Sequence, residues 1–182
     1  MVSSLRQNHF ELFGLHPTFE LDQQKLASDY RELQSAVHPD RFANASDQER
    51  RLSVQKAAQI NEAFQTLKSP LRRARYLLEL KGVEFDDQRE TAIDPAFLME
   101  QMELREALAD IGNDAAGLTS LGKIQDDIQQ RIRSLIEEMG QRLQDDTETA
   151  LNEAKAIVHK LQFLEKLQQE AENKEEDLAN LL

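Results

Sequence analysis

The tripeptide His38-Pro39-Asp40 is the part of the sequence best suited to contact another molecule through charge. Proline disfavours helical backbone in the residue before it, so a helix that runs into this tripeptide must end there. The rigid turn would then present His38 and Asp40 at an exposed tip. An exposed carboxylate can accept charge-assisted hydrogen bonds from an arginine of a partner protein. The tripeptide could also be only a helix stop, and both interpretations stay open on these three residues alone.

Other residue patterns that could support catalysis are incomplete. The segment 117–123 matches most of a phosphate-binding loop, but Ile124 stands where a Ser or Thr would hold magnesium, and no predicted strand precedes it. The four histidines lack metal-site spacing, the chain has no cysteine, and no nucleophile has a suitable base. The sequence therefore predicts no catalytic residue, no metal site and no cofactor, and we expect that the protein is not an enzyme.

The negative charge of the chain is concentrated in its second half. The formal net charge is −12, and nearly all of the excess acid lies in residues 82–182. Such a surface repels phosphate backbones and anionic lipids, so neither nucleic acid nor a membrane is an expected partner. It suits a basic partner protein, although acidity also simply keeps a helical domain in solution. No stretch approaches the roughly 20 apolar residues of a membrane span, and we expect a cytoplasmic protein.

Two amphipathic helical segments flank the tripeptide. Asp22 is a favourable N-cap for a helix over 22–37, and Ser46 with Glu49 has capping-box spacing for a helix that reaches residue 67. Apolar residues recur at helical spacing along both segments: Leu26, Tyr30, Leu33 and Val37, then Ala57, Ile60, Phe64 and Leu67. The pattern predicts an antiparallel helix pair with the tripeptide in the loop at its tip.

Shorter helices are expected on either side of this pair. A helical pattern over 8–13 ends at Gly14, and Ser69-Pro70 begins a helix that reaches Lys81, with Gly82 as its C-cap. The following segment has no clear period. We therefore expect a domain over residues 1–81 and a second one over residues 82–182, both all-α.

The second domain is predicted to be an antiparallel three-helix bundle. Asp94-Pro95 begins its first helix, which runs to about Ile111, and Gly112 and Gly117 bracket a loop. A long helix with one apolar stripe then runs to about residue 143. The last helix begins near residue 148, and we expect it to fray in the acidic segment 175–177.

The first helix of this bundle carries two apolar surfaces. At about 100° per residue, Phe97, Leu104, Leu108 and Ile111 form one stripe, which is the predicted core face. The far side combines apolar and acidic residues: Leu98, Met99, Met102, Glu103, Glu106 and Asp110. Outward apolar residues that include adaptable methionine are typical of a protein-binding surface. They could equally be covered by another part of the chain.

The last helix repeats this arrangement. Ala154, Ile157, Val158 and Leu161 form its inward stripe. Phe163 points about 180° away from that stripe, with Leu167 beside it. We therefore expect Phe163 on an outward face.

The flanks of the tripeptide resemble those of J domains in order and spacing. The matching segments are Phe10–Leu15 and Ile60–Leu67, followed by Pro70 and Arg73. The resemblance implies that His38, Pro39 and Asp40 contact a chaperone ATPase of the DnaK/HscA class and stimulate its ATP hydrolysis. It also implies a basic docking face that includes Lys25 and Arg31. Three acids dilute that face here, Asp22, Asp29 and Glu32, so docking would be weak or restricted to a specialised chaperone.

The second half is similar to the HscB family, the J-domain co-chaperones of iron–sulfur cluster assembly. The segments that carry this resemblance are Arg72–Leu78, Phe97–Glu106 and Lys160–Lys166. The resemblance implies a three-helix domain that binds an IscU-type cluster scaffold. Its scaffold-binding positions fall on Leu98, Met99, Met102, Glu103, Glu106, Asp110 and Phe163, with Met102 and Asp110 in place of a Leu and a Glu. The cysteine-rich module of some eukaryotic members is missing, which favours a bacterial origin.

We therefore expect a co-chaperone that delivers an IscU-type scaffold to an HscA-type ATPase. Because the chain has no cysteine, it would act on the proteins that carry clusters and not on the clusters themselves. The alternative is a general J-domain holdase for unfolded clients. A nucleotide-hydrolysing enzyme, the third possibility, would turn over ATP by itself.

Overall fold

The computed structural model describes residues 7–38, 41, 45–86 and 95–181. In these ranges every regular element is a helix, so the prediction of an all-α protein is confirmed. The chain divides into two compact units, Met1–Leu80 and Lys81–Leu182. None of the helices in the described part is long and apolar enough to cross a membrane.

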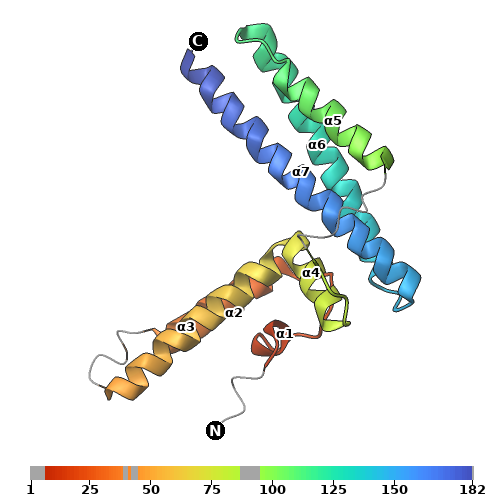
Figure 1. The fold of residues 1–182 in the computed structure, drawn as a ribbon. Helices are drawn as coiled ribbons and strands as arrows, with labels where there is room; N and C mark the ends of the chain where they lie inside the picture. Colours follow the sequence, from red (N-terminus) through yellow and green to blue (C-terminus); the bar gives the residue numbers. More distant parts are fainter. Residues whose placement is uncertain (1–6, 39–40, 42–44, 87–94, 182) are drawn as a thin grey trace. The chain divides into compact units, whose positions relative to one another are not determined.

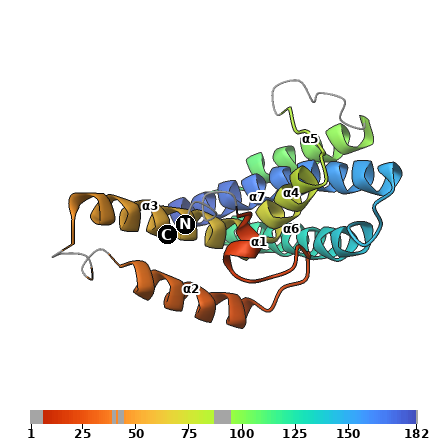
Figure 2. The ribbon, with the colours of Figure 1, turned by 90° about the horizontal axis from the view of Figure 1, so that it is seen from below.

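The first unit is built around a long helix pair. It contains α1 (His9–Leu12), α2 (Gln23–Val37), α3 (Asp47–Lys68) and α4 (Pro70–Leu80). In Figures 1 and 2, α2 and α3 lie side by side and run in opposite directions. The antiparallel pair that the sequence predicted is therefore confirmed.

Side chains at the start of α2 and α3 accept hydrogen bonds from the backbone N–H groups that have no partner within the helix, and so fix where each helix begins. The Asp22 carboxylate accepts hydrogen bonds from the backbone of Gln24 and Lys25 at the start of α2. Ser46 and Glu49 form the expected capping box before α3. The short α1 ends before Gly14, whose φ of 63° is left-handed and strains residues with a side chain.

Aromatic and polar contacts fix the register of α2 against α3. The Tyr30 and Phe64 rings stack with centroids 4.1 Å apart. The Tyr30 hydroxyl donates to Asn61 Oδ1 at 2.6 Å, and Gln34 Nε2 donates to the same oxygen at 2.6 Å. Because Asn61 accepts from two turns of α2, a shift of one helix along the other would break both bonds. These contacts hold α2 in a single register against α3.

A buried arginine closes the end of α3 in the first unit. Arg73 on α4 is 5 % exposed, and its Nη1 donates to the Leu67 carbonyl at 2.5 Å. Carbonyls in the last turn of a helix lack partners within the helix, so this bond satisfies one of them. The guanidinium also lies over the Phe19 ring, 5.0 Å from its centroid, and burial lowers the pKa of Arg73.

The second unit is a three-helix bundle made of α5 (Pro95–Ala109), α6 (Ala115–Arg142) and α7 (Glu148–Leu181). The three helices lie alongside one another in Figure 1, and α6 and α7 are antiparallel neighbours. One apolar cluster joins them, and its buried members are Phe97, Leu104, Leu108, Leu121, Ile128, Phe163, Leu164, Leu167, Ala171 and Leu178. This cluster holds α5 on the longer α6 and α7.

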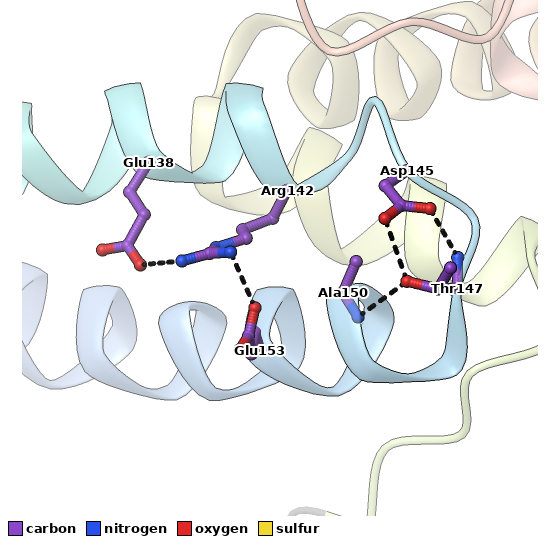
Figure 3. A network of polar contacts seen from close by, with 6 residues as sticks. All are labelled: Glu138, Arg142, Asp145, Thr147, Ala150 and Glu153. Atoms are coloured by element: carbon purple, nitrogen blue, oxygen red, sulfur yellow. Dashed lines mark hydrogen bonds and ion pairs between the residues drawn. The ribbon is translucent and has the colours of Figure 1, made fainter.

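Polar contacts set the tight turn between α6 and α7 (Figure 3). Arg142 on α6 bridges Glu138 on its own helix and Glu153 on α7, the latter at 2.9 Å. Asp145 accepts hydrogen bonds from the Thr147 backbone and hydroxyl, and the Thr147 hydroxyl in turn accepts from the Ala150 N–H at 3.3 Å. Thr147 thereby caps the start of α7.

The segment that follows α4 lies on the first turns of α7. Lys81 forms an ion pair with Asp146, and Lys155 Nζ donates to the Glu84 carbonyl at 2.7 Å. The Lys155 ammonium also lies 5.4 Å from the centroid of the Phe85 ring. Residues 81–85 are therefore part of the second unit.

Two predicted boundaries in the second unit are wrong. Gly117 is not a loop residue but lies buried in the first turn of α6, where its N–H donates to Asp114 Oδ1 at 2.7 Å. Asp114 is a good N-cap, and it starts the helix before the glycine. The predicted fraying near 175–177 does not occur either, because α7 continues to Leu181 with Leu178 buried in the core cluster. Asp94, predicted to cap α5, lies outside the described residues.

We predict that Gly117→Ala destabilises the second unit by about 2 kcal/mol or more, because a Cβ there would overlap the Gly112 carbonyl oxygen. Gly122→Ala is the matched control. Its Cβ meets no atom within 4 Å, so the better helix propensity of alanine should stabilise the unit by roughly 0.5–1 kcal/mol. Urea unfolding followed by circular dichroism measures both. Equal stabilities of the two variants would contradict the close approach of Gly112.

Candidate partner-binding surfaces

The first candidate surface is the end of α2. His38 is exposed and has an extended backbone (φ −57°, ψ 131°), so the helix stops where proline was expected to stop it. The Arg41 N–H donates to the His38 carbonyl at 3.0 Å, and Arg41 Nη1 donates to the Ser35 carbonyl at 3.1 Å. Arg41 thus ties the start of the loop to the last turn of α2. Pro39 and Asp40 lie outside the described residues, so the presentation of the Asp40 carboxylate stays a prediction.

The predicted basic face on α2 is exposed but partly neutralised. Lys25 forms an ion pair with Asp29 at 2.6 Å, one turn further along the helix. The hydrogen bond that Lys25 donates to Asp29 and the negative charge of that carboxylate raise the pKa of Lys25. Arg31 is also exposed. A partner carboxylate that approached Lys25 would have to compete with Asp29, which agrees with the dilution expected from the sequence.

The second candidate surface lies on α5 and has the two-sided pattern that the sequence predicted. Leu98, Met99 and Met102 are 43 %, 64 % and 63 % exposed. The acids expected beside them, Glu103, Glu106 and Asp110, are exposed as well. Phe97, Leu104 and Leu108 on the opposite side are buried in the bundle core. The six exposed residues are called the α5 face below.

Phe163 does not belong to this exposed set, and the expectation of an outward Phe163 is wrong. Its side chain is 9 % exposed and that of Leu167 is 1 % exposed. The Phe163 ring makes an edge-on contact with Phe97, with centroids 5.7 Å apart. The Arg105 guanidinium on α5 covers the ring, 5.4 Å from its centroid. Because α5 packs on the side of α7 that the helical wheel left outward, α7 is buried over a wider arc than one stripe.

Sequence reasoning missed the charged contacts that hold α5 on the bundle. Arg131 on α6 pairs with Glu100 on α5 and with Asp127 on its own helix. These residues line a cavity of about 300 Å³, together with Phe97, Gln130, Ser134, Leu135, Lys160 and Leu164. No periodicity in a single helix reveals the Arg131–Glu100 pair, because its two members lie on different helices. Among the residues that the structure describes, no group of three or more His, Asp or Glu could hold a metal ion.

Comparisons with known proteins match both units. Residues 8–76 match the family model of the DnaJ domain, and residues 93–172 match the family model described as the HSCB C-terminal oligomerisation domain. The chain is 43% identical to the co-chaperone protein HscB homolog of Pseudoalteromonas atlantica, over 95% of this chain and 99% of that protein. It is 46% identical to the homolog of Shewanella halifaxensis, over 94% and 98% of the two chains.

Solved structures agree with these relatives. Chaperone HscB from Vibrio cholerae is 43% identical, with a TM-score of 0.84 over 94% of this chain and 99% of that chain. Human co-chaperone protein HscB is 28% identical, with a TM-score of 0.85 over 93% and 82% of the two chains.

The helix pair and the matched DnaJ domain define a J-domain co-chaperone, a class whose partner is an Hsp70-type chaperone. The chain belongs to the HscB family, which serves iron–sulfur cluster assembly. This is a family of co-chaperones and not of catalytic enzymes. The family resemblance stated from the sequence is therefore confirmed.

The burial of Phe163 predicts a structural cost for its removal. Phe163→Ala should destabilise the second unit by about 3–5 kcal/mol, because it leaves a cavity against Phe97 in the core. Met102→Ala, an exposed position on the same bundle, should change stability by less than about 0.5 kcal/mol. Chemical unfolding of the two variants checks this. A Phe163→Ala protein as stable as Met102→Ala would mean that the ring is not part of the core.

Proposed function

We propose that this protein binds an IscU-type iron–sulfur scaffold through the α5 face and delivers it to an HscA-type chaperone of the DnaK superfamily. Its J domain would stimulate ATP hydrolysis by that chaperone, in the bacterial cytoplasm. The observation that carries the proposal is the exposure of Leu98, Met99 and Met102 on a helix whose opposite side is buried in the bundle core. Large apolar side chains in such a cluster gain free energy when a partner covers them.

The α5 face combines apolar side chains with neighbouring acids, and it therefore suits a partner surface that has an apolar centre and basic groups around it. Fully burying a leucine or methionine contributes about 1.5–3 kcal/mol, and these three side chains are roughly half-exposed already. Their combined burial would supply several kcal/mol of binding free energy. Glu103, Glu106 and Asp110 border them, and such acids increase the association rate with a basic partner and set its orientation.

Phe163 lies on the core side of α5, beneath the proposed binding surface, and not on the surface itself. Its ring supports Phe97, and through it α5, while the Arg105 guanidinium lies over the ring. A partner side chain has little of the ring to contact, because Phe163 is 9 % exposed. The main proposed contribution of Phe163 is therefore to hold α5 in place.

The proposed contact with the chaperone is the tip of the J domain. The helix pair is held in register by Tyr30, Asn61 and Phe64, and α2 ends at Val37, directly before His38, Pro39 and Asp40. Asp40 would accept hydrogen bonds from an arginine of the ATPase. Lys25 and Arg31 would add a basic docking face, which is weak because Lys25 already forms an ion pair with Asp29.

A second candidate function is a general holdase for unfolded clients. Two of the three large apolar residues on the α5 face are methionines, and methionine adapts to differently shaped partners. Competition experiments separate the two functions. An arbitrary denatured protein displaces a scaffold from a holdase, whereas it should not displace a scaffold from a dedicated binding face.

For the chaperone contact, we predict that Asp40→Asn lowers the stimulation of HscA-type ATPase activity at least about tenfold, because it removes a charged hydrogen-bond acceptor. Scaffold affinity should stay unchanged. Glu20→Gln, which removes one exposed negative charge from the same unit, is the control and should stimulate normally. A steady-state ATPase assay with purified chaperone measures this. Normal stimulation by Asp40→Asn would refute the role of the tripeptide.

For the α5 face, Leu98→Ala combined with Met102→Ala should weaken scaffold binding roughly 10- to 100-fold, because each truncation removes apolar contact at the centre of the interface. Leu52→Ala on α3 is a matched control, since Leu52 is 44 % exposed against 43 % for Leu98. It should leave scaffold affinity unchanged. Isothermal titration calorimetry with a purified IscU-type scaffold measures both affinities. Equal affinities of the two variants would show that the scaffold does not bind the α5 face.

A further inference from the structure

A lysine occupies a core-facing position near the end of α7. Leu167, Ala171, Lys174 and Leu178 follow one another at spacings of four, three and four residues, which places them on one side of the helix. Leu167, Ala171 and Leu178 are at most 2 % exposed and belong to the core cluster of the bundle. Lys174 is the charged member of this stripe, where the pattern favours an apolar side chain.

The Lys174 ammonium reaches the last turn of α5. Its Nζ donates to the Leu108 carbonyl at 2.8 Å, and the Ala109 carbonyl lies 3.4 Å away. Carbonyls in the last turn of a helix have no partner within the helix, and they form the negative end of its dipole. Lys174 therefore acts as a C-terminal cap that is supplied by another helix.

This end of α5 has a particular need for positive charge. Glu106 and Asp110, two of the three acids of the α5 face, lie in or just beyond its last turn. Carboxylates at the C-terminus of a helix are unfavourable because they add to the negative end of the dipole. An ammonium that binds the carbonyls of the same turn offsets this repulsion.

A hydrophobic residue at position 174 could fill the stripe but could not bind these carbonyls. The side chain is only partly exposed, and a charge withdrawn from water is costly unless hydrogen bonds replace its hydration. The two carbonyls of α5 provide such bonds. Position 174 therefore suits a cation that binds the last carbonyls of α5 better than a side chain that only packs in the core.

The surrounding residues keep this end of α7 in place. Leu178, one turn beyond Lys174, is buried in the core cluster, and Gln125 on α6 donates to Glu175 at 2.9 Å. The match to the C-terminal domain family ends at residue 172, so Lys174 lies beyond it. The acidic end of α7 therefore belongs to the bundle.

We propose that Lys174 is a positioning residue for partner binding: it fixes the last turn of α5 and thereby the Glu106 and Asp110 carboxylates, which meet basic groups of the partner. This inference rests on the proposed function of the α5 face. It assigns the acidic end of α7 the task of orienting the acidic half of that face.

The test replaces Lys174 by methionine, which suits the apolar stripe but lacks the ammonium. The full-length variant should fold and melt within about 5 °C of the original protein, since apolar burial compensates for the lost cap. The amides of Leu108, Ala109 and Asp110 should exchange with solvent roughly five- to tenfold faster. Affinity for a purified IscU-type scaffold should fall about three- to tenfold.

Two control variants isolate the ammonium at this position. Lys174→Arg keeps a donor to the carbonyls and should retain most of the affinity. Lys166→Met makes the same charge change at an exposed position of α7 and should not weaken binding. The expected fall in affinity of Lys174→Met is itself informative. Loss of a positive charge should by itself strengthen the long-range attraction to a basic partner, so a fall must come from the lost hydrogen bonds. Unchanged affinity of Lys174→Met would overturn the proposal.

A double-mutant cycle shows whether Lys174 acts through the two carboxylates. Glu106→Gln combined with Asp110→Asn should weaken binding less in the Lys174→Met protein than in the original one. Leu98→Ala should have the same effect in both. If the carboxylate variants lose equal affinity in both proteins, Lys174 does not position them.

The same data separate failure of the inference from failure of the proposed function. If Leu98→Ala with Met102→Ala weakens binding but Lys174→Met does not, the α5 face stands and the role of Lys174 is wrong. If neither change affects binding, the α5 face itself is wrong and the inference fails with it.

Discussion

The packing of α5 on α7 is the interaction on which the proposed binding function depends. Phe97 meets Phe163 edge-on, and both belong to a core cluster that also contains Leu104, Leu108 and Leu178. Because α5 contributes its Phe97 and Leu104 side to this core, its other side must face away. The exposure of Leu98, Met99 and Met102 is thus a direct consequence of the core packing and needs no separate cause. Anything that rotates α5 would bury the apolar residues of the α5 face and expose the core.

Different contacts hold the candidate partner-binding surface in place in each of the two units. In the first unit, the contacts of Tyr30 with Asn61 and Phe64 hold α2 in register against α3, and the helix ends at His38, before a proline. In the second unit, side chains from neighbouring helices hold α5: Arg131 binds Glu100, and Lys174 binds the carbonyls of the last turn. In both units, rigid helices position the surface, which limits the conformational entropy that binding must overcome.

Local sequence signals predicted the helices and their caps well because these depend on neighbours within four residues. Asp22, Ser46 and Glu49 cap where expected, and Gly14 ends α1 through its left-handed backbone. The two wrong helix boundaries arose where contacts of the folded chain outweigh the propensity of a residue. Gly117 suggested a loop, but Asp114 caps α6 before it, and the glycine is needed there because Gly112 approaches too closely for a Cβ. The acidic residues near 175 suggested fraying, but Leu178 is buried by helices that precede it by dozens of residues.

The sequence by itself determined the all-α class, the family, the exposed apolar side of α5 and the position of the helix stop at His38, since each follows from periodicity, capping or a contiguous motif. Only the tertiary structure decided that Phe163 is a core residue beneath Arg105, and that Lys174 caps a helix more than sixty residues away. The physical reason is the same in both cases. A helical wheel shows which residues share a face of one helix, but the number of neighbouring helices that cover that face is a property of the whole bundle.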